Sequence, residues 1–172
     1  MGDAIDIRRY EERDRAHVRA LFVRVNRLLA PPHLAGAFQD YVERSLAEEI
    51  SRIADYYRER QGSFWVAHAG GAFAGMFGLE ACGDGAMELR RMYADPDLRR
   101  RGIARTMLVF AEDEARRAGA REMVLSTSEL QKEALALYRT AGYRETHEEI
   151  ADAASNKTIG GGIRRFHFSK AL

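Results

Sequence analysis

The sequence has little cysteine and almost no net charge. Cys82 is the only cysteine among 172 residues. An internal disulfide framework or a cysteine-rich zinc site needs more thiols than that, so both are excluded and a reducing compartment is expected. The 27 Lys and Arg residues nearly balance the 26 Asp and Glu residues. General nucleic-acid binders and membrane-surface binders carry a marked basic excess, which this chain lacks.

Long apolar runs and common phosphate motifs are also missing. No apolar run approaches the roughly 18 residues of a membrane-spanning helix, and the N-terminal segment has acids and arginines where a secretory signal would be apolar. The sequence contains neither G-x-x-x-x-G-K-S/T nor G-x-G-x-x-G between a strand and a helix. Nucleotide hydrolases and dinucleotide-binding oxidoreductases are therefore set aside. These absences predict a cytoplasmic protein that does not associate with membranes.

The chain does have enough apolar material for one core. Hydrophobic residues make up 46% of it and charged residues 31%. It can therefore bury a core and keep a solvated surface, which excludes disorder over the whole chain. Because a single core usually takes about 100–200 residues, we expect one domain over residues 1–172.

Hydrophobic periodicity predicts a mixed α/β order of elements. Apolar positions at three- and four-residue steps predict helices at residues 14–29, 38–61, 103–119 and 132–141. Period-two patterns and glycine turns predict strands at residues 5–10, 64–68, 73–81, 87–94, 123–126, from 143 onward and at 164–169. The order strand, helix, strand between residues 87 and 126 predicts a parallel pair inside the sheet.

One of these strands is irregular. Leu89 and Met92 both have the character of core residues, but their spacing breaks the two-residue period of a flat strand. A β-bulge would restore the period and move this strand away from its parallel neighbour at residues 123–126. Backbone groups freed in such a gap can pair with an extended ligand. The alternative is a bulge without a function.

An arginine-rich loop leads into the third predicted helix, with the sequence Arg99-Arg100-Arg101-Gly102-Ile103-Ala104-Arg105. The first turn of a helix has unpaired N–H groups and the positive end of the helix dipole, so it can bind phosphate. Small residues at Gly102 and Ala104 would let a pyrophosphate approach the backbone. The alternative is a solvated basic surface. Because residues 90–105 hold six arginines, we interpret this segment as a basic pocket for a phosphate-bearing ligand.

Two segments together resemble a known family. Residues 88–96 and the arginine loop are similar to the acetyl-CoA-binding core of the GNAT superfamily of N-acetyltransferases, whose signature is Q/R-x-x-G-x-G/A. Residues 131–143 are similar to its second motif, N-x-x-A-x-x-L-Y followed by G-F/Y, with Ala134 and Tyr138 in place. The chain has Gln131 where that motif commonly has asparagine.

The resemblance implies a fold, an activity and a cofactor. The fold is α/β (α+β), a GNAT-like mixed central sheet of about seven strands, largely antiparallel with a splayed parallel pair and flanked by about four helices. The activity is transfer of the acetyl group of acetyl-CoA to a primary amine of a small molecule or peptide, in a ternary complex and without a metal. The residues expected to bind the cofactor are Met92, Tyr93, Ala94, Arg99, Arg100, Arg101, Gly102, Ile103, Ala104, Arg105 and Gln131.

The resemblance also implies catalytic roles. The amides near Met92 and Tyr93 would polarise the thioester carbonyl. Tyr138 would act as general acid, because a phenol with a pKa of about 10 can protonate a thiolate with a pKa of about 8.5. The alternative for Tyr138 is a packing role on the core side of its helix.

An amine must lose a proton before it attacks, so a base is expected. Glu80 and Glu88 are the candidates because their strands would lie beside the reaction centre, although each is also a candidate for an ordinary salt bridge. His17 and His68 are weaker candidates. Cys82 has no histidine pattern beside it, which favours direct transfer over an acyl-enzyme.

Acceptor recognition is expected from segments that vary around the cofactor site. These are the two N-terminal helices, residues 26–32 and residues 151–163. Aromatic residues that would line this cleft are Tyr41, Tyr56, Tyr57 and Trp65, and the alternative for them is a place in the core. A homodimer is expected from the resemblance alone. Two other interpretations stay open: a non-catalytic acyl-CoA sensor, and a nucleic-acid module that uses Arg99–Arg101 and Arg164-Arg165.

Overall fold

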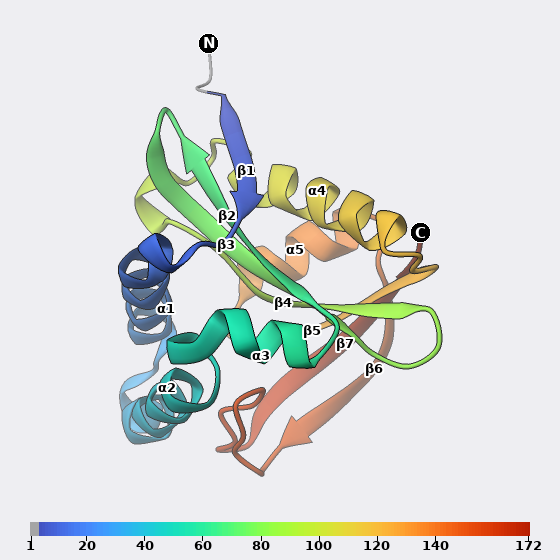
Figure 1. Ribbon diagram of the computed structural model, residues 1–172. Helices are drawn as coiled ribbons and strands as arrows, with labels where there is room; N and C mark the ends of the chain where they lie inside the picture. Colours follow the sequence, from blue (N-terminus) through green and yellow to red (C-terminus); the bar gives the residue numbers. More distant parts are fainter. Residues whose placement is uncertain (1–3) are drawn as a thin grey trace.

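A seven-stranded sheet in the order β1-β2-β3-β4-β5-β7-β6 forms the centre of the structure (Figure 1). The computed structural model describes residues 4–172. Within that range neighbouring strands are antiparallel except for β4 and β5, which are parallel as the sequence predicts. The strands are β1 (Ile5–Arg9), β2 (Ser63–Ala69), β3 (Ala72–Ala81), β4 (Ala86–Ala94), β5 (Glu122–Ser128), β6 (Arg144–Ala151) and β7 (Ile163–Ala171).

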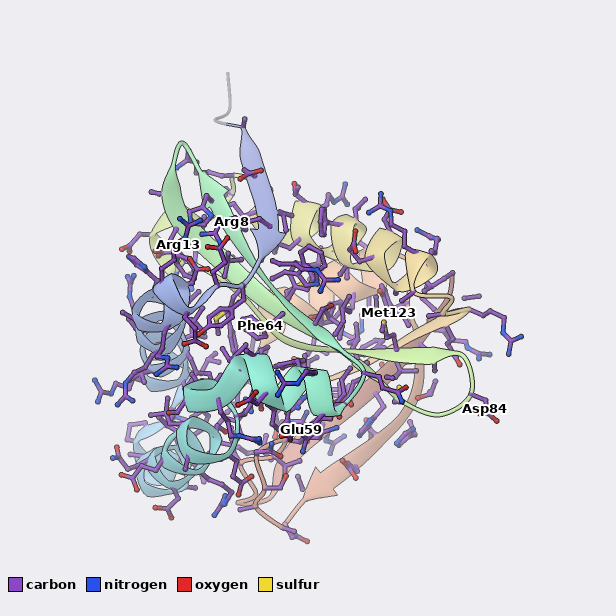
Figure 2. All side chains as sticks on the ribbon, in the orientation of Figure 1. Arg8, Arg13, Glu59, Phe64, Asp84 and Met123 are labelled. Carbon is purple, nitrogen blue, oxygen red and sulfur yellow. The ribbon has the colours of Figure 1, made fainter. Side chains whose placement is uncertain are left out.

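Helices cover both faces of the sheet because its central strands are apolar on both sides. Trp65 of β2 packs in the core formed with α4 and α5, whereas Phe64 packs in the core formed with α1, α2 and α3. Figure 2 shows Phe64 on the side of α1 and α3, and Met123 on the side of α4. The helices are α1 (Arg15–Leu29), α2 (Ala35–Glu48), α3 (Ile53–Glu59), α4 (Ile103–Arg117) and α5 (Lys132–Thr140).

The single helix predicted at residues 38–61 is wrong. The chain forms α2 and α3, with a 3-10 turn at Ile50–Arg52 between them. Glu49 has φ −132° and ψ −62°, which lies outside the helical region. Its side chain is fully buried and binds two arginines of β4. The backbone therefore leaves the helix where this carboxylate turns into the core.

The parallel strands β4 and β5 separate after a short paired stretch. β4 and β5 pair over three residues, of which the last is Glu88 with Val124. β4 keeps its antiparallel pairing with β3 as far as Ala94. The edge of β4 that faces β5 is therefore free from Leu89 onward, and its backbone groups are open to a ligand.

The predicted bulge lies in this free part of β4. Met76 of β3 pairs with Tyr93 and Gly78 pairs with Arg90, so two residues of β4 lie opposite Phe77. Arg91 has a positive φ of 54°, a value that side chains other than glycine seldom adopt outside turns and bulges. The bulge and the opening of the strand pair thus occur together, as the spacing of the apolar residues predicts.

Candidate active site

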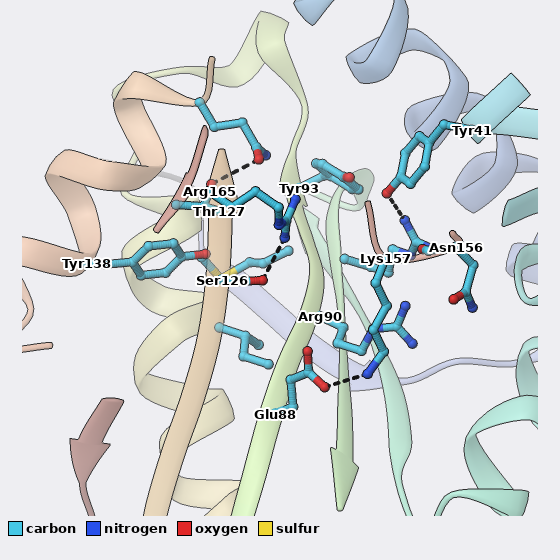
Figure 3. A pocket seen from close by; sticks show the side chains of 14 residues that line it. Tyr41, Glu88, Arg90, Tyr93, Ser126, Thr127, Tyr138, Asn156, Lys157 and Arg165 are labelled. Carbon is cyan, nitrogen blue, oxygen red and sulfur yellow. Dashed lines mark hydrogen bonds and ion pairs between the residues drawn. The ribbon is translucent and has the colours of Figure 1, made fainter. Parts of the chain in front are cut away.

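Two pockets meet at the gap between β4 and β5. The arginine-loop pocket lies among α1, α4 and α5, and its lining includes Leu29, Ala94, Arg99, Ala104 and Leu137. The hairpin pocket is bordered by the loop between β6 and β7, and its lining includes Tyr41, Glu88, Ser126, Tyr138, Lys157 and Arg165 (Figure 3). Both pockets are lined by Met92, Tyr93 and Gln131. They therefore join at the bulge of β4.

The arginine loop has the features of a phosphate site. Gly102 is the N-cap of α4 with a left-handed φ of 75°, and as a glycine it has no side chain that could cap the helix. The N–H groups of its first turn are therefore available to a ligand. A Cβ built on Gly102 would meet no atom within 4 Å, so the backbone faces open space. Arg99 lines the pocket, 3.4 Å from an oxygen of Glu133. Arg99 is exposed, as are Arg100, Arg101 and Arg105.

Arg90 and Arg91 do not belong to that phosphate site. Both are buried and both bind Glu49, at 3.1 Å from Arg90 Nη2 and 2.7 Å from Arg91 Nη2. The bulge interrupts the alternation of side chains along β4, so two successive residues reach one carboxylate. The six-arginine pocket inferred from the sequence is therefore wrong, since two of the six are ion-paired at the hairpin pocket.

Glu49 is the centre of a buried polar cluster. Its Oε1 accepts hydrogen bonds from Tyr57 Oη at 2.7 Å and from Arg91 Nε at 3.1 Å. Arg90 also donates to Glu80 at 2.9 Å. Burial by itself raises the pKa of Glu49, but the ion pairs with Arg91 and Arg90 outweigh it and leave the pKa below its usual value. The charged carboxylate thus fixes both guanidinium groups against β4.

Tyr138 combines packing with an open hydroxyl. Its ring packs against Tyr143 and Phe168, while its hydroxyl points towards Ser126 and the hairpin pocket in Figure 3. The residue is 5% exposed, and burial raises its pKa above the usual 10. The hydroxyl is therefore protonated at neutral pH and can donate to a group at the junction of the pockets.

Gln131 lies at the same junction. Its Oε1 accepts a hydrogen bond from Thr127 Oγ1 at 2.9 Å. The oxygen is thus held on β5, and the amide nitrogen remains for a ligand. This geometry allows the amide contact that the family motif assigns to asparagine.

The two carboxylates expected as bases lie in different pockets. Glu88 lines the hairpin pocket, whereas Glu80 lines a neighbouring pocket with Tyr56. Lys157 connects them, with Nζ 2.8 Å from Glu88 and 3.5 Å from Glu80. Of the two, Glu88 is the one that lines a pocket reaching the junction.

Several residues considered from the sequence lie outside the two joined pockets. His17 and His68 both pack against Phe73. Tyr57 and Trp65 are buried in the two cores. Cys82 follows β3, and burial raises the pKa of its thiol, which disfavours it as a nucleophile.

The segments expected to recognise the acceptor divide between the pockets. Tyr41 of α2 lines the hairpin pocket. Asn156, from the expected 151–163 segment, accepts a hydrogen bond from Arg91 at its backbone oxygen and donates from its side chain to Tyr56. Leu29, from the expected 26–32 segment, lines the arginine-loop pocket instead. The hairpin loop is thus bound to α3 and β4 across the pocket.

Sequence reasoning missed the individual importance of Arg165. It grouped Arg164 and Arg165 as a pair, but successive residues of a strand point to opposite faces. Arg164 binds Glu148 at 3.1 Å on the exposed side. Arg165 enters the hairpin pocket and donates from Nη2 to Ser126 Oγ at 2.6 Å. The alternation along β7 was the signal that could have separated the two.

Comparison with known proteins identifies the family. Residues 9–143 match the model of the acetyltransferase (GNAT) family. The chain belongs to the GNAT family. N-acetyltransferase 8 of Homo sapiens is 34% identical to this domain over 121 residues, which cover 64% of the chain and 52% of the human protein. N-acetyltransferase 8 of Rattus norvegicus is 34% identical over 130 residues, which cover 69% of the chain and 57% of the rat protein.

Solved structures confirm the fold of this GNAT domain. The paia N-acetyltransferase of Thermoplasma acidophilum, solved in complex with coenzyme A, gives a TM-score of 0.75 at 17% identity. The alignment covers 98% of this chain and 99% of that one. The family and the fold class predicted from the two motifs are therefore confirmed.

The GNAT domain covers only part of its relatives, and the family match covers only part of the domain. The chain spans little more than half the length of the two curated relatives. The family match ends at residue 143, so Asn156, Lys157 and Arg165 lie beyond it. No helix within residues 4–172 is both long and apolar enough to cross a membrane.

Proposed function

We propose that this GNAT domain transfers the acetyl group of acetyl-CoA to a primary amine of a small molecule or peptide, by direct attack in a ternary complex. The observation that carries the proposal is the junction of two pockets at the free edge of β4, where Met92, Tyr93 and Gln131 line both. Family membership and the coenzyme A bound by the Thermoplasma protein support the donor. The names of the relatives support an amine acceptor.

The arginine loop would hold the diphosphate of the donor. The amides of Ile103, Ala104 and Arg105 lie in the first turn of α4, which begins after a glycine N-cap, where N–H groups and the helix dipole favour an anion. The free edge of β4 would pair with the pantetheine arm. The amides near Met92 and Tyr93 would donate to the carbonyl oxygen. Bound acetyl-CoA supplies a thioester whose carbonyl carbon is the electrophile.

The side chains at the junction would move two protons. As the acceptor nitrogen bonds to the carbonyl carbon and the carbon–sulfur bond breaks, Glu88 takes the proton that nitrogen loses, directly or through a water molecule. Tyr138 gives its hydroxyl proton to the departing sulfur. Both groups then return to their starting states by exchange with solvent, which leaves an amide and a free thiol as products.

Free thiol released from acetyl-CoA in the presence of an amine panel tests this function. We expect release with at least one acceptor, together with thermal stabilisation by acetyl-CoA alone. Stabilisation without release would favour the acyl-CoA sensor. Salt-sensitive nucleic-acid binding without stabilisation by acetyl-CoA would favour the nucleic-acid module.

Gly102→Ala is expected to raise the KM for acetyl-CoA about tenfold with little change in kcat. The added methyl group would occupy the open space above the loop and cost a phosphate hydrogen bond, about 1.4 kcal/mol. Gly119→Ala is the matched control, because Gly119 ends the same helix with a left-handed φ of 87° and the same open surroundings. Both variants carry similar backbone strain. An equal rise in KM for both would contradict the assignment of the loop.

Glu88→Gln is expected to lower kcat/KM on the order of 10²-fold, the lower end of the range for a general base. Glu80→Gln is the matched control, since Glu80 shares Lys157 but lines a different pocket. Steady-state rates normalised to folded protein distinguish the two. A larger loss in the Glu80 variant would remove Glu88 as the base.

A further inference from the structure

Arg165 differs from the other charged side chains of the hairpin pocket because it has no ionic partner. Lys157 binds Glu88, and Arg90 and Arg91 bind Glu49. Within residues 4–172 Arg165 forms no ion pair. Its side-chain hydrogen bond runs from Nη2 to Ser126 Oγ at 2.6 Å and leaves Nε and Nη1 to the pocket.

The other cations of the pocket each have a carboxylate partner. Arg90 and Arg91 bind Glu49, Arg90 also binds Glu80, and Lys157 binds Glu88. Among these four cations Arg165 is the one without a carboxylate in contact in the described part of the chain. Burial lowers the pKa of Arg165, yet a guanidinium keeps its proton at physiological pH. A half-buried cation without an anion is costly, so the site favours a ligand that supplies one.

The carboxylates near Arg165 are already engaged. Glu149 lies opposite Arg165 in the pairing of β6 with β7, but its side chain binds His167 Nε2 at 3.0 Å. Glu88 lines the same pocket and binds Lys157 at 2.8 Å. Within residues 4–172 neither carboxylate forms an ion pair with Arg165, so this guanidinium is open to the carboxylate of a bound molecule.

We infer that the amine acceptor carries a carboxylate and that Arg165 binds it. This inference rests on the proposed function and names its substrate class, an amino acid. The guanidinium plane is held at one end by Ser126, and a carboxylate matches the remaining nitrogens in a charge-assisted contact. Because Tyr138 and Glu88 line the same pocket as Arg165, a molecule held there would present its amine towards the junction at Met92.

Matched acceptors test the inference on the unmodified protein. Phenylalanine is compared with phenethylamine and with phenylalaninamide, and lysine with cadaverine, by thiol release from acetyl-CoA. We expect kcat/KM to be roughly thirtyfold higher for at least one amino acid than for its carboxylate-free partners, as a desolvated charge pair predicts. Equal efficiency would overturn the inference and leave acetyl transfer standing. If none of these acceptors led to thiol release, both the inference and the proposed acetyl transfer would be overturned.

Variants of Arg165 and of its neighbour Arg164 show which side chain binds the carboxylate. Arg165→Gln should raise the KM for the amino acid roughly thirtyfold, with kcat and the efficiency for the carboxylate-free amine nearly unchanged. Arg165→Lys keeps the charge, so its KM for the amino acid should lie between those of the wild type and of Arg165→Gln. Arg164→Gln is the matched control because Arg164 is exposed and bound to Glu148. Equal KM values in the Arg164 and Arg165 variants would contradict the assignment.

Discussion

Replacing Glu49 with glutamine is expected to lower the free energy of unfolding by about 3–5 kcal/mol, because it leaves two buried guanidinium groups without their shared anion. Glu49 is 0% exposed, and it binds Arg90 and Arg91 through both of its oxygens. Equilibrium denaturation with urea measures the loss. Complete failure to fold would agree in direction, since a single domain of this size has about 5–15 kcal/mol of stability in all.

Glu48→Gln is the matched control for this prediction. Glu48 is the preceding residue and is exposed at the end of α2, so its replacement should change stability by less than about 0.5 kcal/mol. A similar loss in both variants would show that the cluster does not depend on the Glu49 charge.

The stabilisation by Glu49 should also depend on pH. The folded-state pKa of Glu49 lies below the usual 4.5, so the native state holds this carboxylate in its charged form more strongly than the unfolded chain does. Its contribution is therefore complete above about pH 4.5 and is lost as the pH falls through the folded-state value. The stability difference between the wild type and Glu49→Gln should be constant from pH 6 to pH 8, about 3–5 kcal/mol, and shrink in acid. A difference that grows in acid would contradict this.

Tyr138→Phe is expected to lower kcat about 10²- to 10⁴-fold, the range for loss of a positioned general acid. The substitution keeps the ring that packs against Tyr143 and Phe168 and removes only the hydroxyl at the pocket junction. The KM for acetyl-CoA should be nearly unchanged. Because the pKa of Tyr138 is raised above 10 by burial, the wild-type rate should show no alkaline loss from this group below that pH.

Tyr143→Phe is the control for the chemistry of Tyr138. The Tyr143 hydroxyl donates to buried Glu112 at 3.0 Å, and the side chain lines neither of the joined pockets. Its loss should cost about 1 kcal/mol of stability and little in kcat. If the two tyrosine variants retained equal kcat values, Tyr138 would be a packing residue and the departing thiolate would take its proton elsewhere. Binding of acetyl-CoA with no turnover in any form would favour the sensor.

Local sequence patterns predicted the bulge of β4 and the start of α4 because the geometry of both is local. The spacing of Leu89 and Met92 predicted the bulge, and the glycine before Ile103 predicted the start of α4. Both features follow from the backbone of a few adjacent residues. Neither requires knowledge of which distant segments come together.

The hairpin pocket could not be predicted in this way because it depends on distant contacts. The apolar stripe continues through Leu46, Ile50 and Ile53, so periodicity did not reveal that the helix ends before Glu49. An acid on that buried stripe was the one available signal. Arg90 and Arg91 were assigned to the phosphate site by their closeness in sequence, and the bulge sends both to α2 and α3 instead.

The hairpin of β6 and β7 lies beyond the part of the chain that matches the family model. The recognisable family segment stops at residue 143, and the hairpin then returns Asn156, Lys157 and Arg165 to the pocket wall. If Arg165 binds the acceptor as we propose, a change in these three side chains would alter which acceptor is used while leaving the arginine loop as it is. On this proposal, two chains with the same family match can differ in their acceptors. The difference would lie in the last 29 residues of the sequence, 144 to 172.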